Sequence, residues 1–538
     1  MGEAGRDREV GALPVGPVTL LRRAALMNTT VAVLTPTRRY LRLAAAVFTV
    51  AAALVVIVAY SLCAWALVKY PWDWSPDDGL QLDFARRLLE SPASVFHGHS
   101  VPFPSWFGPL YPALLTPLVH LAHPLAASRI FALGLTWLGA LAVVVLLRRR
   151  AGLLWGLAGA ALCLSVFEIT SWYMLLRSDT LLVTLWLWAT VLLLPSDLRH
   201  GADRLSAARI AGGTALLLGA TLAKPTGAVH GLPLVLVWFL VDRRSAWRLI
   251  LVVGSAGLAI FALLEAATKG GFLGALLLLR FHGYAPGLTT QILRDFGERT
   301  WPVILLALVA GLAAWKRKAH PERDPVGIML AGGLLVLPMI GKQGACLNYL
   351  LPLFVALVVA AGCWAARGLH TASGWRPVVP AAAAALALAL AATRTFPLPT
   401  TYDEAAARTL YGFTQAFHRK VGGPFLVSVP NLVYFQIGQD TEIEGSIFAQ
   451  MVAHDAPGVR DVLTRLEQAR YTLVVETWPL PAQPEWQAAL HRNYRALGAC
   501  RLGSYFTGYD SRLYARRGLP VDFTPPVGVR CLAVPDGH

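Results

Sequence analysis

Long stretches without a charged side chain are the feature that most constrains the fold of this sequence. Of its 538 residues, 56% are hydrophobic and only 14% are charged, whereas a soluble protein is about one-quarter charged. A run of roughly 20 apolar residues is enough for a helix to cross the hydrocarbon core of a bilayer. Because such runs recur along the chain, the sequence predicts a mostly α-helical protein that spans a membrane many times.

The apolar runs define the expected spanning helices. We expect about 11 of them between residues 42 and 393, with boundaries good to a few residues. They are expected at about 42–69, 113–147, 152–168, 178–195, 209–223, 226–241, 247–266, 300–315, 326–341, 347–366 and 377–393.

Basic residues fall in short clusters between these runs, and their spacing predicts an orientation. The net charge of +16 would suit a nucleic-acid partner, but cations that alternate with apolar spans are typical of cytoplasmic loops. We therefore expect no nucleic-acid binding. The clusters lie in alternate loops and include Arg148 to Arg150, Arg199, Arg204, Arg209, Arg243, Arg244, Arg248, Lys316 to Lys318, Arg367 and Arg376.

This orientation places the tail of residues 1–41 in the cytoplasm, as part of a signal anchor, with Met1 or Met27 as the start. The segments expected on the outer face are the loop of residues 70–112, the 168–178 turn, the turn at Lys224, the 267–299 loop, the 342–346 turn and the C-terminal region. The sequence thus predicts a protein of the inner (cytoplasmic) membrane, with candidate site residues at the outer ends of its spans.

The first outer loop, residues 70–112, is expected to contain a short helix. Ser75 suits its N-cap, and Pro76 and the following acids suit its first turn. Leu80, Phe84 and Leu88 then repeat at helical spacing. We expect an amphipathic helix that lies on the membrane surface.

Two adjacent carboxylates, Asp77 and Asp78, begin this helix. In one interpretation they are a general base and a second acid, and together they could also hold a divalent metal. In the other, Asp78 caps the helix from its third position, as in a capping box. A cap needs only one acid, so we expect a functional role for Asp77, and the sequence leaves the need for a metal open.

Further polar residues gather at the outer ends of later spans. Arg177 and Asp179 could bind a phosphate beside a second carboxylate, or simply pair at a helix start. Lys224 could bind a lipid phosphate or snorkel. We expect His230 to be buried and hydrogen-bonded rather than a ligand.

The remaining candidates lie in two outer segments. Arg280, His282 and Tyr284 could meet an anion, or could contact lipid headgroups in a solvated loop. The last segment offers Lys342 as a phosphate partner, with Asn348 and Tyr349 either in the site or tying helices together.

From residue 394 the composition becomes that of a soluble domain. We expect a small extracytoplasmic α/β domain over residues 394–538. Strands are expected in GPFLVSVP and YTLVVET and as a pair within SYFTGYDSRLYAR, and helices in VRDVLTRLEQAR and PEWQAALHRNY. Cys500 and Cys531 are either a disulfide or two thiols.

The order of short motifs resembles a known family. After the acidic first loop come FGPLYPALLTPL, RSDTLLVTLWLWA, LAKPTGAVHGLPL and NYLLPLFVAL. Over about residues 40–370 the chain is similar to the GT-C superfamily of polyprenyl-phosphate-dependent glycosyltransferases, and most to its family 39-like, ArnT-like and protein O-mannosyltransferase-like branches. The resemblance implies a GT-C-type bundle and transfer of a sugar from a polyprenyl-phosphate donor, with inversion.

The resemblance also implies roles for particular residues. Asp77 would be the base that deprotonates an acceptor hydroxyl, with Asp78 and Asp179 as further acids. Arg177, Lys224 and Lys342 would hold the donor phosphate. From the residues alone, Arg280 is a further candidate for the phosphate, and the candidates for substrate contact are His282, Tyr284, Asn348 and Tyr349. The family pattern has a glutamate where this chain has Asp78 and a tyrosine where it has Gln81, so the resemblance does not fix the division of labour between the acids.

A transporter or flippase of lipid-linked or polar solutes is the main alternative. It predicts polar residues near mid-span, broken helices and inverted repeats, whereas the unexplained polar residues here gather at span ends. A non-catalytic envelope assembly protein is a third option. The expected partners of the enzyme are a polyprenyl-phosphate sugar, membrane lipids and an envelope acceptor that could be a lipid, a glycan or a protein.

Overall fold

The computed structural model describes most of the chain. The described residues are 36–91, 93, 95–96, 108–165, 174–201, 203–277, 283–316, 325–370, 398–427, 435, 437–439, 448, 451–456, 458–477, 480–502 and 509–533. The N-terminal tail up to residue 35 and the span expected at 377–393 lie outside them.

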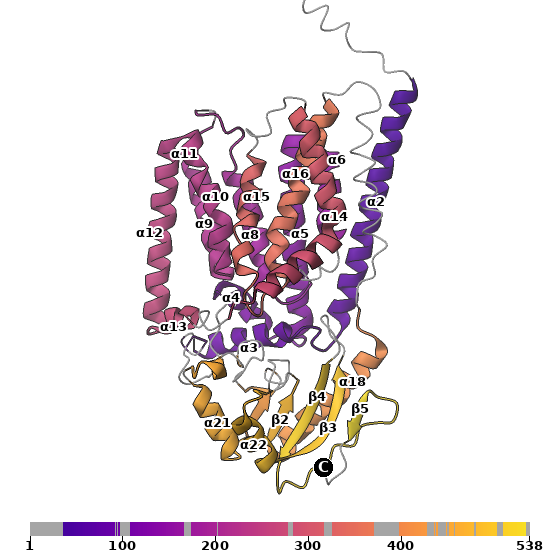
Figure 1. Ribbon diagram of the computed structural model, residues 1–538, viewed down its shortest axis with the longest axis vertical. Helices are drawn as coiled ribbons and strands as arrows, with labels where there is room; N and C mark the ends of the chain where they lie inside the picture. Colours follow the sequence, from indigo (N-terminus) through magenta and orange to yellow (C-terminus); the bar gives the residue numbers. More distant parts are fainter. Residues whose placement is uncertain are drawn as a thin grey trace, which may run out of the picture.

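Long helices run side by side and form an upright bundle, with a smaller C-terminal unit at one end (Figure 1). The bundle helices are α2 (Pro36–Lys69), α5 (Pro124–Ala151), α6 (Leu153–Ser165), α8 (Ser178–Leu193), α9 (Ala207–Ala223), α10 (Thr226–Leu236), α11 (Trp238–Val241), α12 (Arg243–Ala267), α14 (Pro286–Lys316), α15 (Val326–Leu334) and α16 (Leu351–His370). Most expected spans therefore appear as helices.

By length and composition, four described helices are apolar enough to cross a membrane: Ala46–Lys69, Pro124–Ala151, Arg243–Ala267 and Leu347–Ala366. Five shorter apolar helices of 10–17 residues stand among them. Exposed leucines cover the outer surface of α2 and α12, as expected for helices that face lipid.

The prediction of a single span over residues 113–147 is wrong at its N-terminal end. The structure has a short helix α4 (Leu110–Leu115), a 3₁₀ turn η1 (Thr116–Leu118), and then α5 from Pro124. Prolines explain the break, because Pro117 and Pro124 lack the N–H that a helix interior needs and are tolerated only in a first turn.

Arg149 and Arg150 of the first basic cluster lie at the end of α5 that is away from the C-terminal unit. Arg149 donates a hydrogen bond to the carbonyl of Val191 (3.2 Å), and Arg150 donates to Pro195 (2.8 Å). These arginines therefore satisfy carbonyls at the C-terminal end of α8. Their position agrees with the alternation of charge along the sequence.

Helix α3 (Pro76–Glu90) lies across the other end of the bundle, between the bundle and the C-terminal unit (Figure 1). It does not lie open on a membrane surface as expected. Leu80 and Phe84 pack with helix α13 (Gly271–Leu277) and C-terminal helices. Leu82 packs with the C-terminal sheet, and Ala85 with the bundle core. Tertiary packing thus covers several sides of this helix.

The C-terminal unit is built on a five-stranded sheet in the order β1-β2-β4-β3-β5. Its strands are β1 (Phe425–Val427), β2 (Leu473–Glu476), β3 (Tyr494–Leu502), β4 (Tyr509–Arg516) and β5 (Cys531–Ala533), and its helices include α18 (Thr401–Val421), α21 (Val459–Glu467) and α22 (Pro484–Asn493). β1 and β2 are parallel, and the other pairs are antiparallel.

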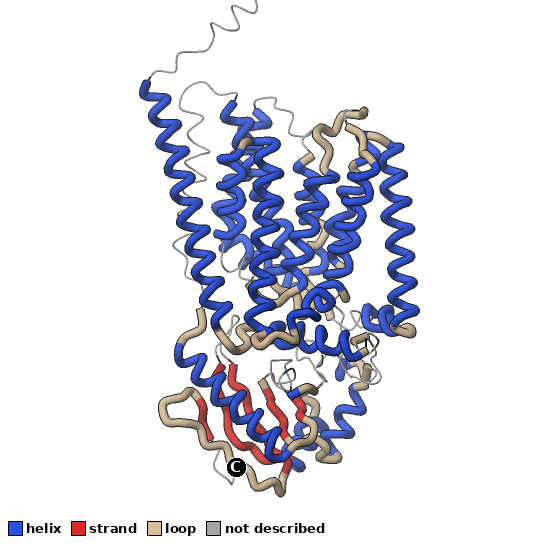
Figure 2. Tube along the Cα trace, turned by 180° about the vertical axis from the view of Figure 1, so that it is seen from behind, coloured by secondary structure: helices blue, strands red, loops and turns tan. Residues whose placement is uncertain are grey.

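Alternate residues of β1 and β2 face opposite layers, as the pleat of a strand requires. Phe425 and Leu473 pack under α18, whereas Leu426 and Val474 pack against α21 and α22. Figure 2 shows α18 crossing one face of the sheet. Helices therefore cover both faces.

The prediction of two paired strands within SYFTGYDSRLYAR is wrong for one of the two strands. β4 lies there, but its antiparallel partner is β3, which begins at Tyr494, directly after α22. A register shift between Ala496 and Gly498 interrupts the alternation of β3. Because of this bulge, the sequence of β3 lacks the strict alternation that predicts a strand.

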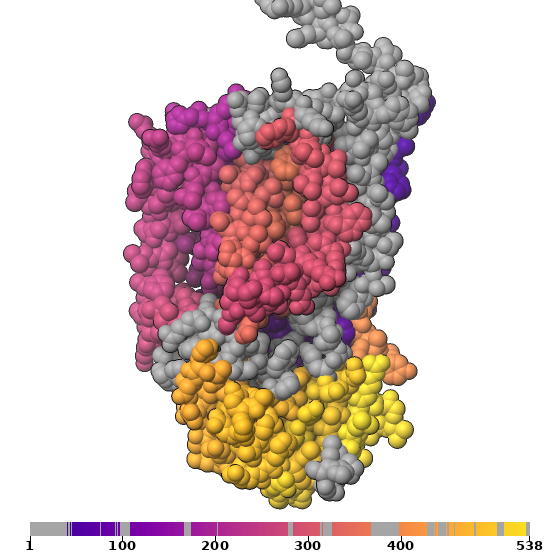
Figure 3. Space-filling model, viewed as in Figure 1, coloured from indigo at the N-terminus to yellow at the C-terminus, as the bar shows by residue number. Residues whose placement is uncertain are grey.

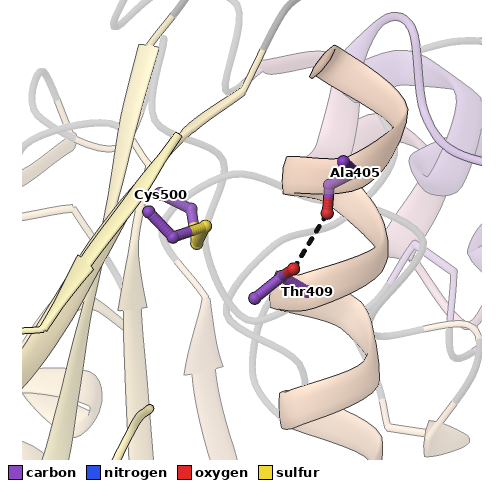
Figure 4. Close-up of a disulfide and its surroundings, with 4 residues drawn as sticks. Ala405, Thr409 and Cys500 are labelled. Atoms are coloured by element: carbon purple, nitrogen blue, oxygen red, sulfur yellow. Dashed lines mark hydrogen bonds between the residues drawn. A yellow bond between two sulfur atoms is a disulfide. The ribbon is translucent and has the colours of Figure 1, made fainter. Parts of the chain in front are cut away.

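Cys500 and Cys531 form a disulfide between the paired strands β3 and β5. Figure 4 shows Cys500 beside α18, near the turn where Thr409 donates a hydrogen bond to the carbonyl of Ala405. The two-thiol alternative is therefore wrong, and the disulfide ties the edge strand to the sheet beneath α18.

Candidate active site

The two adjacent acids of α3 have different surroundings, and Asp78 is the structural one. Its carboxylate accepts hydrogen bonds from the Trp74 N–H (3.1 Å), the Leu176 N–H (3.0 Å) and the Arg129 guanidinium (2.6 Å). Asp78 has no exposed surface, and Arg129 has 1%. Arg129 also donates to the carbonyls of Leu67, Tyr70 and Trp72. The pair therefore fixes the start of α3 on the bundle.

Sequence reasoning missed Arg129. The available signal was a lone arginine in the apolar run PLAASRIFAL, near the outer end of a span, where a charge is costly unless it has a partner. Its partner Asp78 lies 51 residues away, and no local pattern identifies such a pair.

Asp77 contacts the next residue of the segment that precedes α8, Arg177. It forms an ion pair with Arg177 and accepts a hydrogen bond from the Ser75 hydroxyl (3.1 Å). The Ser75 oxygen in turn accepts from the Asp77 N–H (3.3 Å) and caps the helix, as expected. Burial raises the pKa of Asp77, and the charge of Arg177 opposes that shift. Burial thus disfavours the charged form of the Asp77 carboxylate, which nevertheless stays partly accessible to solvent.

Asp179 links three other candidates at the first turn of α8. Its carboxylate pairs with Lys224 (2.8 Å) and with Arg177 (3.4 Å), and it accepts a hydrogen bond from the Asn348 amide (3.2 Å). Lys224 is the C-cap of α9, and Asn348 lies in the 3₁₀ turn η6 (Leu347–Leu350). With α3, which Asp77 joins to Arg177, four chain segments that are remote in sequence therefore converge on one cluster.

Two more candidates lie beside this cluster. The Lys224 ammonium stands 4.4 Å from the centre of the Tyr349 ring, a cation–π contact. Lys342 is half-buried, and its ammonium has no hydrogen-bond or ion-pair partner among the described residues. Burial and the neighbouring charge of Lys224 lower the pKa of Lys342 to about 8. A cation that is desolvated without a counter-ion is well suited to receive an anion.

A short pairing of backbone segments holds Tyr284 next to Lys342. Gln343 N–H donates to Gly283 (2.9 Å), and Ala285 N–H donates to Gly341 (2.8 Å). A Cβ at Gly341 would come within 2.4 Å of the exposed Tyr284 ring, so a larger residue there would displace that ring. Arg280 and His282 lie outside the described residues, and their expected roles remain predictions.

His230 is buried and hydrogen-bonded, as expected. Its Nδ1 lies 2.9 Å from the Gly332 carbonyl, and its own carbonyl accepts from Trp186 (3.0 Å). It therefore ties helices together.

The acids of the site are matched by cations rather than grouped around a metal position. Asp77, Asp78 and Asp179 each pair with arginine or lysine. Across the part of the chain that the structure describes, no group of three His, Cys, Asp or Glu side chains could hold a metal ion.

Comparison with solved structures identifies the architecture. The chain superposes on ArnT from Cupriavidus metallidurans bound to undecaprenyl phosphate with a TM-score of 0.56 and 14% identity, over 85% of this chain and 97% of that one. The apo form of ArnT gives a TM-score of 0.54 over the same shares, again at 14% identity.

The chain has a GT-C fold. The resemblance noted in the sequence is thereby confirmed at the level of fold. No family model and no curated protein matched the sequence. In this GT-C chain the candidate cluster lies at the end of the bundle that the C-terminal unit covers; Figure 3 shows that unit beneath the bundle.

Proposed function

We propose that the protein is an integral membrane glycosyltransferase, which moves a sugar from a polyprenyl-phosphate donor to an acceptor hydroxyl with inversion at the anomeric carbon. The observation that carries the proposal is the placement of a base beside cations in a GT-C fold. Asp77 pairs with Arg177, Arg177 and Lys224 both pair with Asp179, and Lys342 lies within reach of the charge of Lys224.

Asp77 is the general base of the proposed reaction. The acceptor hydroxyl transfers its proton to the Asp77 carboxylate while its oxygen bonds to the anomeric carbon. The bond from that carbon to the phosphate oxygen breaks, and polyprenyl phosphate leaves with the electron pair. The raised pKa of Asp77 makes it a better proton acceptor than an ordinary aspartate. Asp78 is not the base in this proposal, because backbone N–H groups and Arg129 occupy its carboxylate.

The cations stabilise the leaving phosphate. Lys342 has no counter-ion among the described residues, whereas Arg177 and Lys224 are held by Asp77 and Asp179. Donors that are already in place cost no reorganisation when charge develops on the leaving group. The ArnT structure that binds undecaprenyl phosphate supports a lipid phosphate as the donor carrier. Asn348, Tyr349, Tyr284 and, from the sequence, Arg280 and His282 complete the proposed site.

The proposed location is the inner membrane, with the N-terminus in the cytoplasm. The arginines at the far end of the bundle mark the cytoplasmic side by the positive-inside rule. The site and the C-terminal unit then lie on the extracytoplasmic side, where the disulfide is stable. The acceptor is an envelope lipid, glycan or protein.

Turnover of a donor panel tests the proposal. Purified protein in lipid nanodiscs is incubated with radiolabelled polyprenyl-phosphate sugars, and release of polyprenyl phosphate is followed together with sugar transfer to membrane extracts. We expect turnover of at least one donor. A protein that turns over none, yet moves labelled lipid across the bilayer of a proteoliposome, would contradict the proposal in favour of a transporter.

A further inference from the structure

Gln81 is a buried amide whose carbonyl oxygen has no partner. Its side chain is 1% exposed, and Oε1 accepts no hydrogen bond from any described residue. Most buried side-chain oxygens accept a hydrogen bond, and an exception calls for an explanation. The oxygen is either an uncompensated cost to the fold or a position that awaits a donor from a ligand.

The position of Gln81 on α3 favours a ligand. At about 100° per residue, position 81 lies about 40° round the helix from position 77 and about 60° from position 78. Gln81 therefore stands between the two acids on the helix surface, one turn further along. Asp77 contacts Arg177 and Asp78 contacts the Leu176 N–H, so this face of α3 is directed toward the segment that precedes α8.

Apolar packing on both sides of Gln81 fixes the position of its amide. Leu80 and Phe84 belong to one hydrophobic cluster, and Ala85 belongs to the bundle core. The amide thus stands between two apolar clusters beside the proposed base. A ligand with a hydroxyl or amine donor would be stabilised by a hydrogen bond to this buried acceptor, because the acceptor otherwise stays unpaired in apolar surroundings.

We propose that Gln81 is a specificity-determining residue: its Oε1 accepts a hydrogen bond from a hydroxyl of the sugar that is transferred. The inference rests on the proposed function. In the proposed reaction the transferred sugar lies between the base at Asp77 and the phosphate held by Arg177 and the lysines, and the face of α3 that carries Gln81 is directed toward the segment that contains Arg177. A site built to accept a bond from a hydroxyl rejects an analogue without it, because the acceptor then stays unpaired.

Gln81→Met is the test variant, because methionine keeps the length and helix propensity of glutamine but has no acceptor oxygen. Binding is measured in nanodiscs for two probes of equal chain length: a polyprenyl-phosphate sugar and the sugar-free polyprenyl phosphate. We expect the wild type to bind the sugar-bearing probe more tightly than the sugar-free probe. In Gln81→Met the ratio of these two affinities should be about tenfold smaller. Affinity for the sugar-free probe should not change.

Thermal unfolding separates this role from a structural one. Removal of an unsatisfied buried acceptor should leave Tm unchanged or raise it, so a folded variant with a lower sugar affinity supports the proposal. An equal gain from the sugar in both proteins would overturn it. A change only in the KM for acceptor would also overturn it, by moving Gln81 to the acceptor side. A wild type that binds neither probe would instead contradict the proposed function itself.

Discussion

Arg177 forms an ion pair with Asp77 across 100 residues of sequence. The pair joins the first turn of α3 to the start of α8, and Arg177 also contacts Asp179. One guanidinium therefore lies between the proposed base and the acid that holds Lys224. In the proposed reaction we therefore expect the protonation of Asp77 and the binding of the leaving phosphate to be coupled through Arg177.

Replacement of this guanidinium should shift the pH dependence of the reaction. Arg177 holds the pKa of Asp77 below the value that burial alone would give. In Arg177→Gln the pKa of Asp77 should rise, and the acid limb of kcat/KM should move to higher pH, because the base must be deprotonated to act. A profile of kcat/KM against pH measures this. An acid limb at the wild-type position would contradict the coupling.

Lys342 should set the alkaline limit of the same profile. Its pKa is lowered to about 8, so the ammonium of the free enzyme is lost as pH rises through that value. We expect kcat/KM to fall above about pH 8 in wild type, since a neutral amine holds phosphate poorly. Lys342→Arg keeps its charge at all these pH values and should lose this limb. A limb unchanged in the variant would remove Lys342 from phosphate binding.

The buried pair of Asp78 and Arg129 should matter for folding. Arg129→Leu leaves the Asp78 carboxylate without its counter-ion and removes the hydrogen bonds that Arg129 donates to the carbonyls of Leu67, Tyr70 and Trp72. Removing one partner of a buried ion pair costs about 3–5 kcal/mol. Thermal unfolding in detergent should show a large loss of stability for Arg129→Leu. A Tm equal to that of wild type would contradict the structural role that we give to Asp78.

The C-terminal unit should support the first loop through Tyr411. Its hydroxyl donates to Asp73 (2.6 Å), and its ring stacks on Trp72 with the centroids 5.0 Å apart. Tyr411→Phe removes only the hydrogen bond to a charged group, which is worth about 1.5–3 kcal/mol. We expect lower stability and a reduced kcat with little change in donor KM. Tyr402→Phe, an exposed tyrosine of the same helix, serves as the control.

The spanning helices and the positions of the candidate residues could be predicted because they follow from local rules. Scarcity of charge marks the spans, and the unexplained polar residues at their outer ends, such as Asp179, Lys224 and Asn348, do meet in one cluster. The partner of Asp78 and the covered position of α3 could not be predicted, because both arise when segments far apart in sequence pack together. Strand β3 could not be predicted for a local reason: its bulge interrupts the alternation of buried and exposed residues by which a strand is recognised in a sequence.

The central claim is that Asp77 removes the proton from the acceptor hydroxyl. The most direct test compares Asp77→Asn with Glu90→Gln, an exposed acid of the same helix that pairs only with Arg86 among the described residues. Sugar transfer from a polyprenyl-phosphate donor is measured for folded protein in nanodiscs. Our account predicts a loss of about 100-fold or more in kcat for Asp77→Asn, as for a general base, and near wild-type turnover for Glu90→Gln. Equal turnover in Asp77→Asn and wild type would contradict the account.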